Sequence, residues 1–221
     1  MKALIFGASG LVGGCLIEKL LEDRDFDVII SMGRSILPIS HPKLDQQIAD
    51  FENLDFHRDF FKVDVVFCCV GTTMAKAGSK EAFTKVDFLI PVMIAKIASD
   101  EKVKKIVTVS SLGASPDSSN FYLKTKGAME QDILSHNIPV SIFVRPSLLV
   151  GKRKKLRMGE KFGELVLNIF GFLLIGSLKK YKSILADDVA KAMLILAKTA
   201  TKSQVVLSDE IKKISHSKII N

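Results

Sequence analysis

The chain has 221 residues, enough for one large domain with a complete hydrophobic core. Its 32 basic and 24 acidic residues give a net charge of +8, which suits phosphate groups, nucleic acid or an anionic membrane and says nothing about the fold. The three cysteines, Cys15, Cys68 and Cys69, are an odd number and do not form a disulfide framework. We therefore expect a reduced, intracellular setting and predict a cytoplasmic location.

No export signal or membrane span is predicted. Only four apolar residues, 3–6, precede Gly7, too few for the hydrophobic region of a signal peptide. The longest apolar stretch, 165–178, is interrupted by Asn168 and two glycines, and it is shorter than the roughly 20 residues that span a bilayer. We interpret it as a buried helix.

Strands and helices are predicted to alternate along the chain. Apolar, β-branched runs predict strands at 2–6, 28–32, 63–70, 106–109, 140–144 and 205–207. Apolar residues at helical spacing predict helices at 11–21, 83–98, 122–135, 160–172 and 187–198. Helices of this length provide the crossovers that parallel strands require, so the sequence predicts an α/β fold with a doubly wound parallel sheet of the Rossmann type.

A glycine-rich turn joins the first predicted strand to the first predicted helix. Its glycines follow the spacing GxxGxxG, which places backbone amides at a helix N-terminus where they attract phosphate groups. Glycines also mark ordinary turns, but a position between strand and helix in a βαβ unit is the context that a dinucleotide site requires. We predict a dinucleotide site at Gly7, Ser9, Gly10, Leu11, Val12 and Gly13.

The second predicted strand ends without the acidic residue that NAD-preferring sites use to hold the ribose hydroxyls. Arg34 and Ser35 follow it instead. An arginine at this position can form a charge-assisted fork with a 2′-phosphate, although a solvated loop arginine is the simpler alternative. We predict that NADP(H) is preferred, with NAD(H) as the second option.

Several segments carry a family resemblance: GASGLVG at 7–13, FCCVGTT at 67–73, Ser110 with Ser111, and Tyr122 with Lys126. Together they resemble the short-chain dehydrogenase/reductase superfamily, and the GxxGxxG spacing points to its extended and atypical branches. The longer segments SSLGASPDSSNFYLKTKGAMEQ and VRPSLLVG are similar to the Tat-interacting-protein oxidoreductase group of atypical members. The resemblance runs from the N-terminus to about Gly151.

The resemblance implies further cofactor contacts. In the strand numbering of the resembled fold, Gly71 and Thr72 follow the fourth strand and would line the nicotinamide-side ribose. Asp50 and Phe51 follow its third strand and would flank the adenine. An acidic residue at a strand end is also an ordinary turn residue. The remaining residues predicted to bind the cofactor are Cys69, Val70, Lys126 and Arg145.

A proton-transfer site is implied at Ser111, Tyr122 and Lys126. Tyr122 and Lys126 are four residues apart, so on a helix they share a face. In the resembled superfamily the tyrosine donates a proton to a substrate carbonyl, and the lysine binds ribose and lowers the tyrosine pKa because a nearby cation favours the phenolate. Ser111 would polarise the carbonyl, a role that Ser110 could also fill.

One domain, 1–221, is predicted, because no repeat or linker divides the chain. Residues 1–150 would form the dinucleotide-binding core and 151–221 a small C-terminal cap on the substrate side. The basic run 152–157 is explained most simply as a solvated loop, although it could bind an acidic substrate, partner or membrane. Nucleic acid and metal are not expected, since aromatic residues do not interleave with the basic run and the four histidines are scattered.

The sequence thus favours an NADP(H)-dependent reductase of a carbonyl substrate that it does not identify. The alternative is a redox-sensing or regulatory dinucleotide-binding protein without turnover, which would act through a protein partner. A sugar-nucleotide epimerase is disfavoured, because the segment after Arg145 leaves little room for a substrate domain. A homodimer and a protein partner are both left open.

Overall fold

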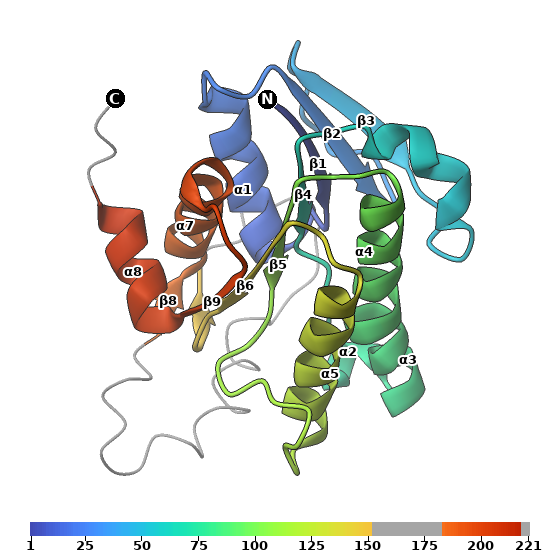
Figure 1. Ribbon diagram of the computed structural model, residues 1–221, viewed down its shortest axis with the longest axis vertical. Coiled ribbons are helices and arrows are strands. Elements are labelled where there is room, and N and C mark those ends of the chain that lie inside the picture. Colours follow the sequence, from blue (N-terminus) through green and yellow to red (C-terminus); the bar gives the residue numbers. More distant parts are fainter. Residues whose placement is uncertain (152–182, 218–221) are drawn as a thin grey trace.

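The chain forms a three-layer α/β structure in a computed structural model that describes residues 1–151 and 183–217. Within these residues, seven strands form an all-parallel sheet with helices on both faces (Figure 1). The strand order is β3-β2-β1-β4-β5-β6-β9, so the direction of winding reverses between β1 and β4. The predicted doubly wound Rossmann-type fold is therefore confirmed, and ligands bind such sheets at the carboxyl ends of strands beside this reversal.

Six strands of the main sheet lie close to the predicted ranges, whereas no range was predicted for β3. The strands of this sheet are β1 (Lys2–Phe6), β2 (Val28–Gly33), β3 (Leu44–Ile48), β4 (Val65–Cys68), β5 (Lys105–Val109), β6 (Val140–Arg145) and β9 (Gln204–Leu207). A separate parallel pair consists of β7 (Leu149–Val150) and β8 (Ile184–Leu185). Because β4, β5 and β6 are buried almost throughout, their continuous apolar runs match strands covered on both faces.

The described helices are α1 (Leu11–Glu22), η1 (Leu54–Phe61), α2 (Met74–Ala77), α3 (Lys80–Thr84), η2 (Lys85–Leu89), α4 (Ile90–Asp100), α5 (Phe121–Ser135), α7 (Ala186–Thr199) and α8 (Ser208–His216). The helix predicted at 83–98 is not uniform, because a π-helical turn, η2, lies between α3 and α4. The helix predicted at 160–172 lies outside the described residues.

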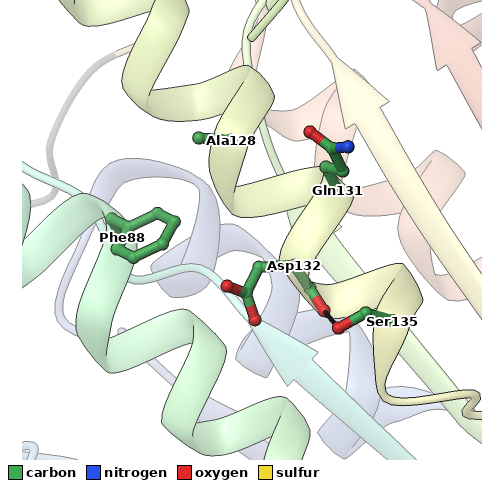
Figure 2. A pocket seen from close by; sticks show the side chains of 5 residues that line it. All are labelled: Phe88, Ala128, Gln131, Asp132 and Ser135. Atoms are coloured by element: carbon green, nitrogen blue, oxygen red, sulfur yellow. Dashed lines mark hydrogen bonds between the residues drawn. The ribbon is translucent and has the colours of Figure 1, made fainter.

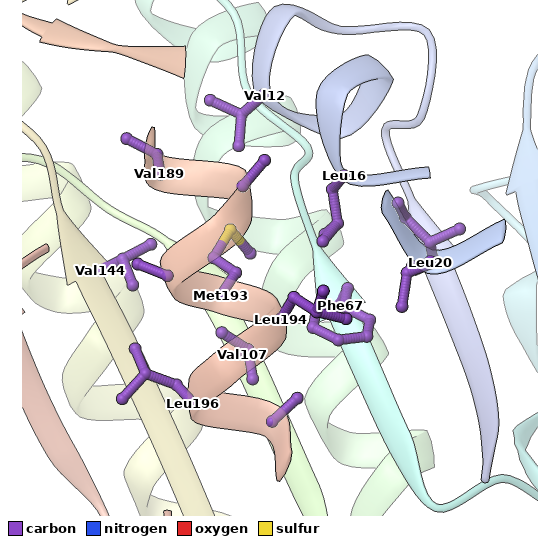
Figure 3. Close-up of a cluster of buried hydrophobic side chains, with 14 of the residues drawn as sticks. Val12, Leu16, Leu20, Phe67, Val107, Val144, Val189, Met193, Leu194 and Leu196 are labelled. Atoms are coloured by element: carbon purple, nitrogen blue, oxygen red, sulfur yellow. The ribbon is translucent and has the colours of Figure 1, made fainter. Parts of the chain in front are cut away.

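Two hydrophobic clusters fix the helices on the sheet. In the first, α1 and α7 pack side by side on one face, where Leu16 and Leu20 of α1 meet Met193 of α7 above Phe67 and Val107 of the sheet (Figure 3). The second cluster lies on the opposite face, under η1, α4 and α5. Since both faces are covered, the sheet holds the strand ends of the functional site in a fixed frame.

Part of the predicted C-terminal cap belongs to the core. β9 extends the main sheet beside β6, and α7 packs against α1 in the first cluster. The basic run 152–157 and the whole apolar stretch 165–178 of the predicted cap fall in 152–182, outside the described residues. Within 1–151 and 183–217, no helix has the length and apolar character needed to cross a membrane.

Candidate functional site

The glycine turn is built by close contact between β1, α1 and the end of β4. Gly7 has a φ of +81°, and a Cβ at Gly7 would lie 2.5 Å from the carbonyl carbon of Cys69. A Cβ at Gly13 would lie 2.2 Å from the carbonyl oxygen of Gly7, which also accepts a hydrogen bond from the Gly10 amide at 2.9 Å. Side chains do not fit at these positions, so glycine is required for the turn, α1 and the end of β4 to approach this closely.

The first turn of α1 is suited to an anion. Gly10 is the N-cap, it provides no side-chain cap, and the first turn contains no acidic residue. The positive end of the helix dipole and its free amides are therefore not neutralised by the helix itself. Ser9 is exposed beside them, Leu11 is half-buried, and Val12 is buried in the first hydrophobic cluster. These features fit the pyrophosphate of a dinucleotide.

Lys126 is the most buried cation of the predicted site. Its Nζ lies 2.7 Å from Oδ1 of Asp87, and both side chains are buried. Burial is the largest single effect and acts to lower the pKa of Lys126. The charge and hydrogen bond of Asp87, together with charge interactions with Tyr122 and Cys68, outweigh burial, so the pKa of Lys126 lies above its ordinary value. Lys126 is therefore held as an ammonium ion.

The same carboxylate reaches the end of β4. Oδ2 of Asp87 accepts a hydrogen bond from the Thr72 amide at 2.8 Å. A Cβ at Gly71 would lie 3.3 Å from Oδ1 of Asp87 and 3.8 Å from Nζ of Lys126. The structure thus brings three predicted residues, Gly71, Thr72 and Lys126, together around one carboxylate. Cys69 and Val70, half-buried, connect them to the glycine turn.

Tyr122 lies in the first turn of α5, where its ring packs 5.6 Å from the ring of Phe83 on α3. The helix starts here because the Asn120 side chain accepts a hydrogen bond from the Leu123 amide at 3.1 Å. Phe83 is fully buried, so its ring gives one side of the Tyr122 ring a fixed packing surface.

The loop after β5 brings the two predicted serines toward α5. A Cβ at Gly127 would lie 2.2 Å from the carbonyl carbon of Ser115, so this loop packs directly on the helix. Ser111 is buried, and its hydroxyl donates to the Leu112 carbonyl at a long 3.5 Å. Ser110 is also buried, and its hydroxyl has no hydrogen-bond partner among the described residues. Both hydroxyls are suited to a polar ligand group.

The residues predicted for the adenine side follow two neighbouring strands. Arg34 is exposed directly after β2, with half-buried Ser35 beside it. Asp50 is exposed after β3, and hydrogen bonds from the Asn53 side chain and the Glu52 amide hold its pKa below the ordinary value. Its carboxylate thus closes a local turn.

Two further predicted residues have packing partners. Phe51 is half-buried, 6.2 Å ring to ring from Phe6, which belongs to the second cluster. Arg145, at the end of β6, donates through Nε and one terminal nitrogen to both carboxylate oxygens of the buried Glu130 on α5. That bidentate pair joins strand to helix, and it occupies part of the hydrogen-bonding capacity of the guanidinium.

Asp87 and Phe83 were not predicted from the sequence. No spacing links Asp87 to Lys126, since one lies on η2 and the other on α5. The available signal was a lone acidic residue in the apolar run VDFLIPVMI, where a charge is buried only with a partner.

A hollow of about 330 Å³ lies beside α5 and is separate from these residues (Figure 2). Its lining residues are Phe88, Ala128, Gln131, Asp132 and Ser135. None of the residues predicted for the site lines this hollow. Lys126, which is on the same helix, is buried instead. Among the described residues, no cluster of metal-ligating side chains is present.

A parallel sheet with this strand order and a glycine turn beside the reversal defines a dinucleotide-binding protein of the Rossmann class. A family model described as NAD(P)H-binding matches residues 7–167. The chain belongs to this NAD(P)H-binding family, as an atypical short-chain dehydrogenase/reductase that resembles the Tat-interacting-protein group.

The relatives support this assignment. Protein FMP52, mitochondrial, of Meyerozyma guilliermondii is 38% identical over 70% of this chain and 67% of its own length. The protein of the same name from Debaryomyces hansenii is 33% identical over 89% of this chain and 88% of its own. Protein HTATIP2 of Rattus norvegicus is 34% identical over 72% of this chain and 67% of its own.

Solved structures support the fold. MoeE5 in complex with UDP-glucose and NAD has a TM-score of 0.71 at 16% identity, over 97% of this chain and 81% of its own. The UDP-glucose 4-epimerase of Thermotoga maritima has a TM-score of 0.72 at 14% identity, over the same shares of the two chains. At these identities the likeness concerns the fold alone.

The predicted cytoplasmic location is wrong, because six of the curated relatives are named mitochondrial proteins. The prediction was argued from cysteine usage and the absence of an export signal. Neither property separates the cytosol from a mitochondrial compartment, since cysteines are also found reduced outside the cytosol.

Proposed function

We propose that the chain is an NADP(H)-dependent reductase that acts on a carbonyl substrate. The observation that carries the proposal is the place of Lys126, whose buried ammonium lies beside Gly71 at the end of β4 and one helical turn from Tyr122. This arrangement puts a cation and a phenol on one helix, next to the strand end that follows the glycine turn. A nicotinamide ribose and a reacting carbonyl would fit against these groups.

The residues of the chain would then divide the work. The α1 amides hold the pyrophosphate, and Lys126 donates hydrogen bonds to ribose hydroxyls. When bound, the cofactor supplies the hydride. Tyr122 donates the proton of its Oη to the carbonyl oxygen, which Ser111 polarises with a hydrogen bond. Ser110 is the second serine suited to that contact, since its hydroxyl is buried and without a partner among the described residues.

The preference for NADP(H) is proposed from the end of β2. Arg34 is exposed there, next to Ser35, and no carboxylate directly follows β2. A guanidinium offers two parallel N–H groups to a 2′-phosphate, whereas a carboxylate would repel it.

The reductase is tested by following NADPH absorbance with purified protein and a panel of aromatic aldehydes, ketones and an ortho-quinone. We expect substrate-dependent oxidation that Tyr122→Phe abolishes while NADPH affinity changes less than about threefold, because the phenol acts on the substrate. Tyr181→Phe is the matched control, since Tyr181 is the only other tyrosine. Unchanged turnover in Tyr122→Phe would contradict the role of the tyrosine.

A regulatory dinucleotide-binding protein without turnover is the second candidate. It is favoured by the Asp87–Lys126 pair, because an ammonium already balanced by a carboxylate acts less strongly on a neighbouring phenol. NADPH binding without oxidation of any carbonyl in the panel would favour this function. A partner protein would then change its affinity for the chain when NADPH is added, as linkage requires.

A further inference from the structure

Asp87 holds two separate elements with one carboxylate. Oδ1 pairs with Nζ of Lys126 on α5 at 2.7 Å, and Oδ2 accepts from the Thr72 amide, beyond β4, at 2.8 Å. The aspartate lies in η2, a π-helical turn within an otherwise α-helical segment, and its side chain is 1% exposed. Single π-turns often occur at functional sites.

Burial of this pair has an energetic consequence. An ionised carboxylate or ammonium in a protein interior is strongly unfavourable without a partner, so each charge depends on the other. The buried Lys126 would otherwise be pushed toward the neutral amine. Gly71, which is exposed, lies directly against the pair, since a Cβ there would be 3.3 Å from Oδ1 of Asp87 and 3.8 Å from Nζ of Lys126.

We propose that Asp87 is the positioning residue of the site: it fixes Lys126 as an ammonium beside Gly71, where ammonium and carboxylate together offer a donor and an acceptor to the vicinal hydroxyls of a ribose. The first half of this inference concerns the chain alone. The second half rests on the proposed binding of a nicotinamide dinucleotide. A lone lysine would offer donors only, whereas a diol has hydroxyls that both donate and accept.

Two other titratable groups act on Lys126. Tyr122 lies one turn earlier on α5, and Cys68 comes from β4. Burial raises the pKa of the Cys68 thiol to about 11, so at neutral pH it is uncharged. The carboxylate of Asp87 is therefore the anion that holds the charge of Lys126.

The first test measures the titration of Lys126 itself by NMR of lysine labelled at Cε, with the resonance assigned through Lys126→Met. In the wild type we expect no titration below the ordinary lysine pKa of 10.5. In Asp87→Asn the amide oxygen can still accept from Thr72 while the charge is lost, so the lysine midpoint should fall by about 1 to 3 pH units. An unchanged midpoint in a folded variant would overturn the inference.

The second test measures NADPH affinity by calorimetry from about pH 7 to about pH 10. The wild type should show a flat profile, and Asp87→Asn should lose about tenfold or more as pH rises through the lowered lysine midpoint. Asp23→Asn is the matched control. Asp23 is also a largely buried carboxylate, and its Oδ2 lies 3.0 Å from Nζ of Lys198, in a part of the structure separate from the site. Parallel profiles for Asp87→Asn and the wild type would overturn the positioning role.

Folding is controlled with the double variant Asp87→Asn/Lys126→Met, a neutral pair of similar shape. It should recover most of the stability that Asp87→Asn loses. Failure to recover any stability would contradict the mutual dependence of the Asp87 and Lys126 charges. If NADPH does not bind the wild type, the proposed function fails, while the lysine titration still decides whether Asp87 sets the charge of Lys126.

Discussion

The glycines of the turn differ in how much room a methyl group would find. At Gly13 a Cβ would lie 2.2 Å from the Gly7 carbonyl oxygen, whereas at Gly14, one residue along α1, the nearest atom is the Ala8 carbonyl oxygen at 3.6 Å. The first distance forces the backbone apart and the second is an ordinary contact. The two positions therefore form a matched pair.

Gly13→Ala should lower the free energy of unfolding by about 1–3 kcal/mol, because the added methyl overpacks a backbone contact. NADPH affinity should fall about tenfold or more. Gly14→Ala should instead raise stability by about 0.5–1 kcal/mol, as alanine does within a helix, with little change in affinity. Urea unfolding and calorimetry measure both quantities, and equal effects at the two sites would contradict the geometry.

Arg34→Ala should weaken NADPH binding about 10- to 100-fold, since a charge-assisted hydrogen bond contributes about 1.5–3 kcal/mol. NADH, which lacks the 2′-phosphate, should bind the variant as it binds the wild type. Arg24→Ala is the control, because Arg24 is also an exposed arginine but lies before β2. Equal losses for NADPH and NADH would mean that Arg34 does not contact the phosphate.

For single residues of the site, prediction from the sequence worked best at positions where only one residue type fits. The glycine turn was predicted because only glycine permits its contacts. Asp87 was missed because its importance arises from a contact between η2 and α5 that no local pattern encodes. Asp50 was predicted from the family resemblance, and the structure gives its carboxylate hydrogen bonds within its own turn.

The start of α5 determines where Tyr122 lies. Asn120→Ala removes the side chain that caps the Leu123 amide, and should cost about 1 kcal/mol of stability. Because Tyr122 is in the first turn, fraying there should also reduce any turnover by more than it reduces NADPH affinity. Ser119→Ala, at the exposed preceding residue, is the control. Stability equal to the wild type in Asn120→Ala would contradict the capping contact.

The positions of six strands were predicted well, whereas β3 was given no range and the interruption of the helix between β4 and β5 was missed. Central strands are buried on both faces and leave continuous apolar runs that are readily recognised. Apolar spacing over 83–98 predicts one regular helix, yet the chain contains α3, η2 and α4 in succession. The π-turn contains Asp87, whose partners Lys126 and Thr72 lie elsewhere in the chain, and periodicity does not register such contacts.

The whole molecule should protect Cys68 from thiol reagents until it unfolds. Cys68 lies in the central strand β4, fully buried, and burial raises its pKa to about 11. The thiolate is the reactive form, so both access and ionisation are blocked near pH 8, the range where an ordinary thiol with pKa ~8.5 reacts. Labelling followed by peptide mass spectrometry should modify the half-buried Cys15 first. Labelling of Cys68 as fast as Cys15 would contradict the buried core.

The overall fold followed from the alternation of elements, which fixes a parallel sheet and its crossovers. The strand order placed the glycine turn beside the reversal between β1 and β4, as a dinucleotide site requires. The cellular location could not be predicted in this way, because proteins of compartments with similar redox conditions have similar cysteine usage.

We propose that this site binds a nicotinamide dinucleotide and prefers the phosphorylated form. The most direct test is calorimetric titration of the purified chain with NADPH and then with NADH at one salt concentration. We predict that NADPH binds at least about tenfold more tightly than NADH. Binding of neither would contradict the assignment of the glycine turn, and equal binding of both would contradict the role of Arg34.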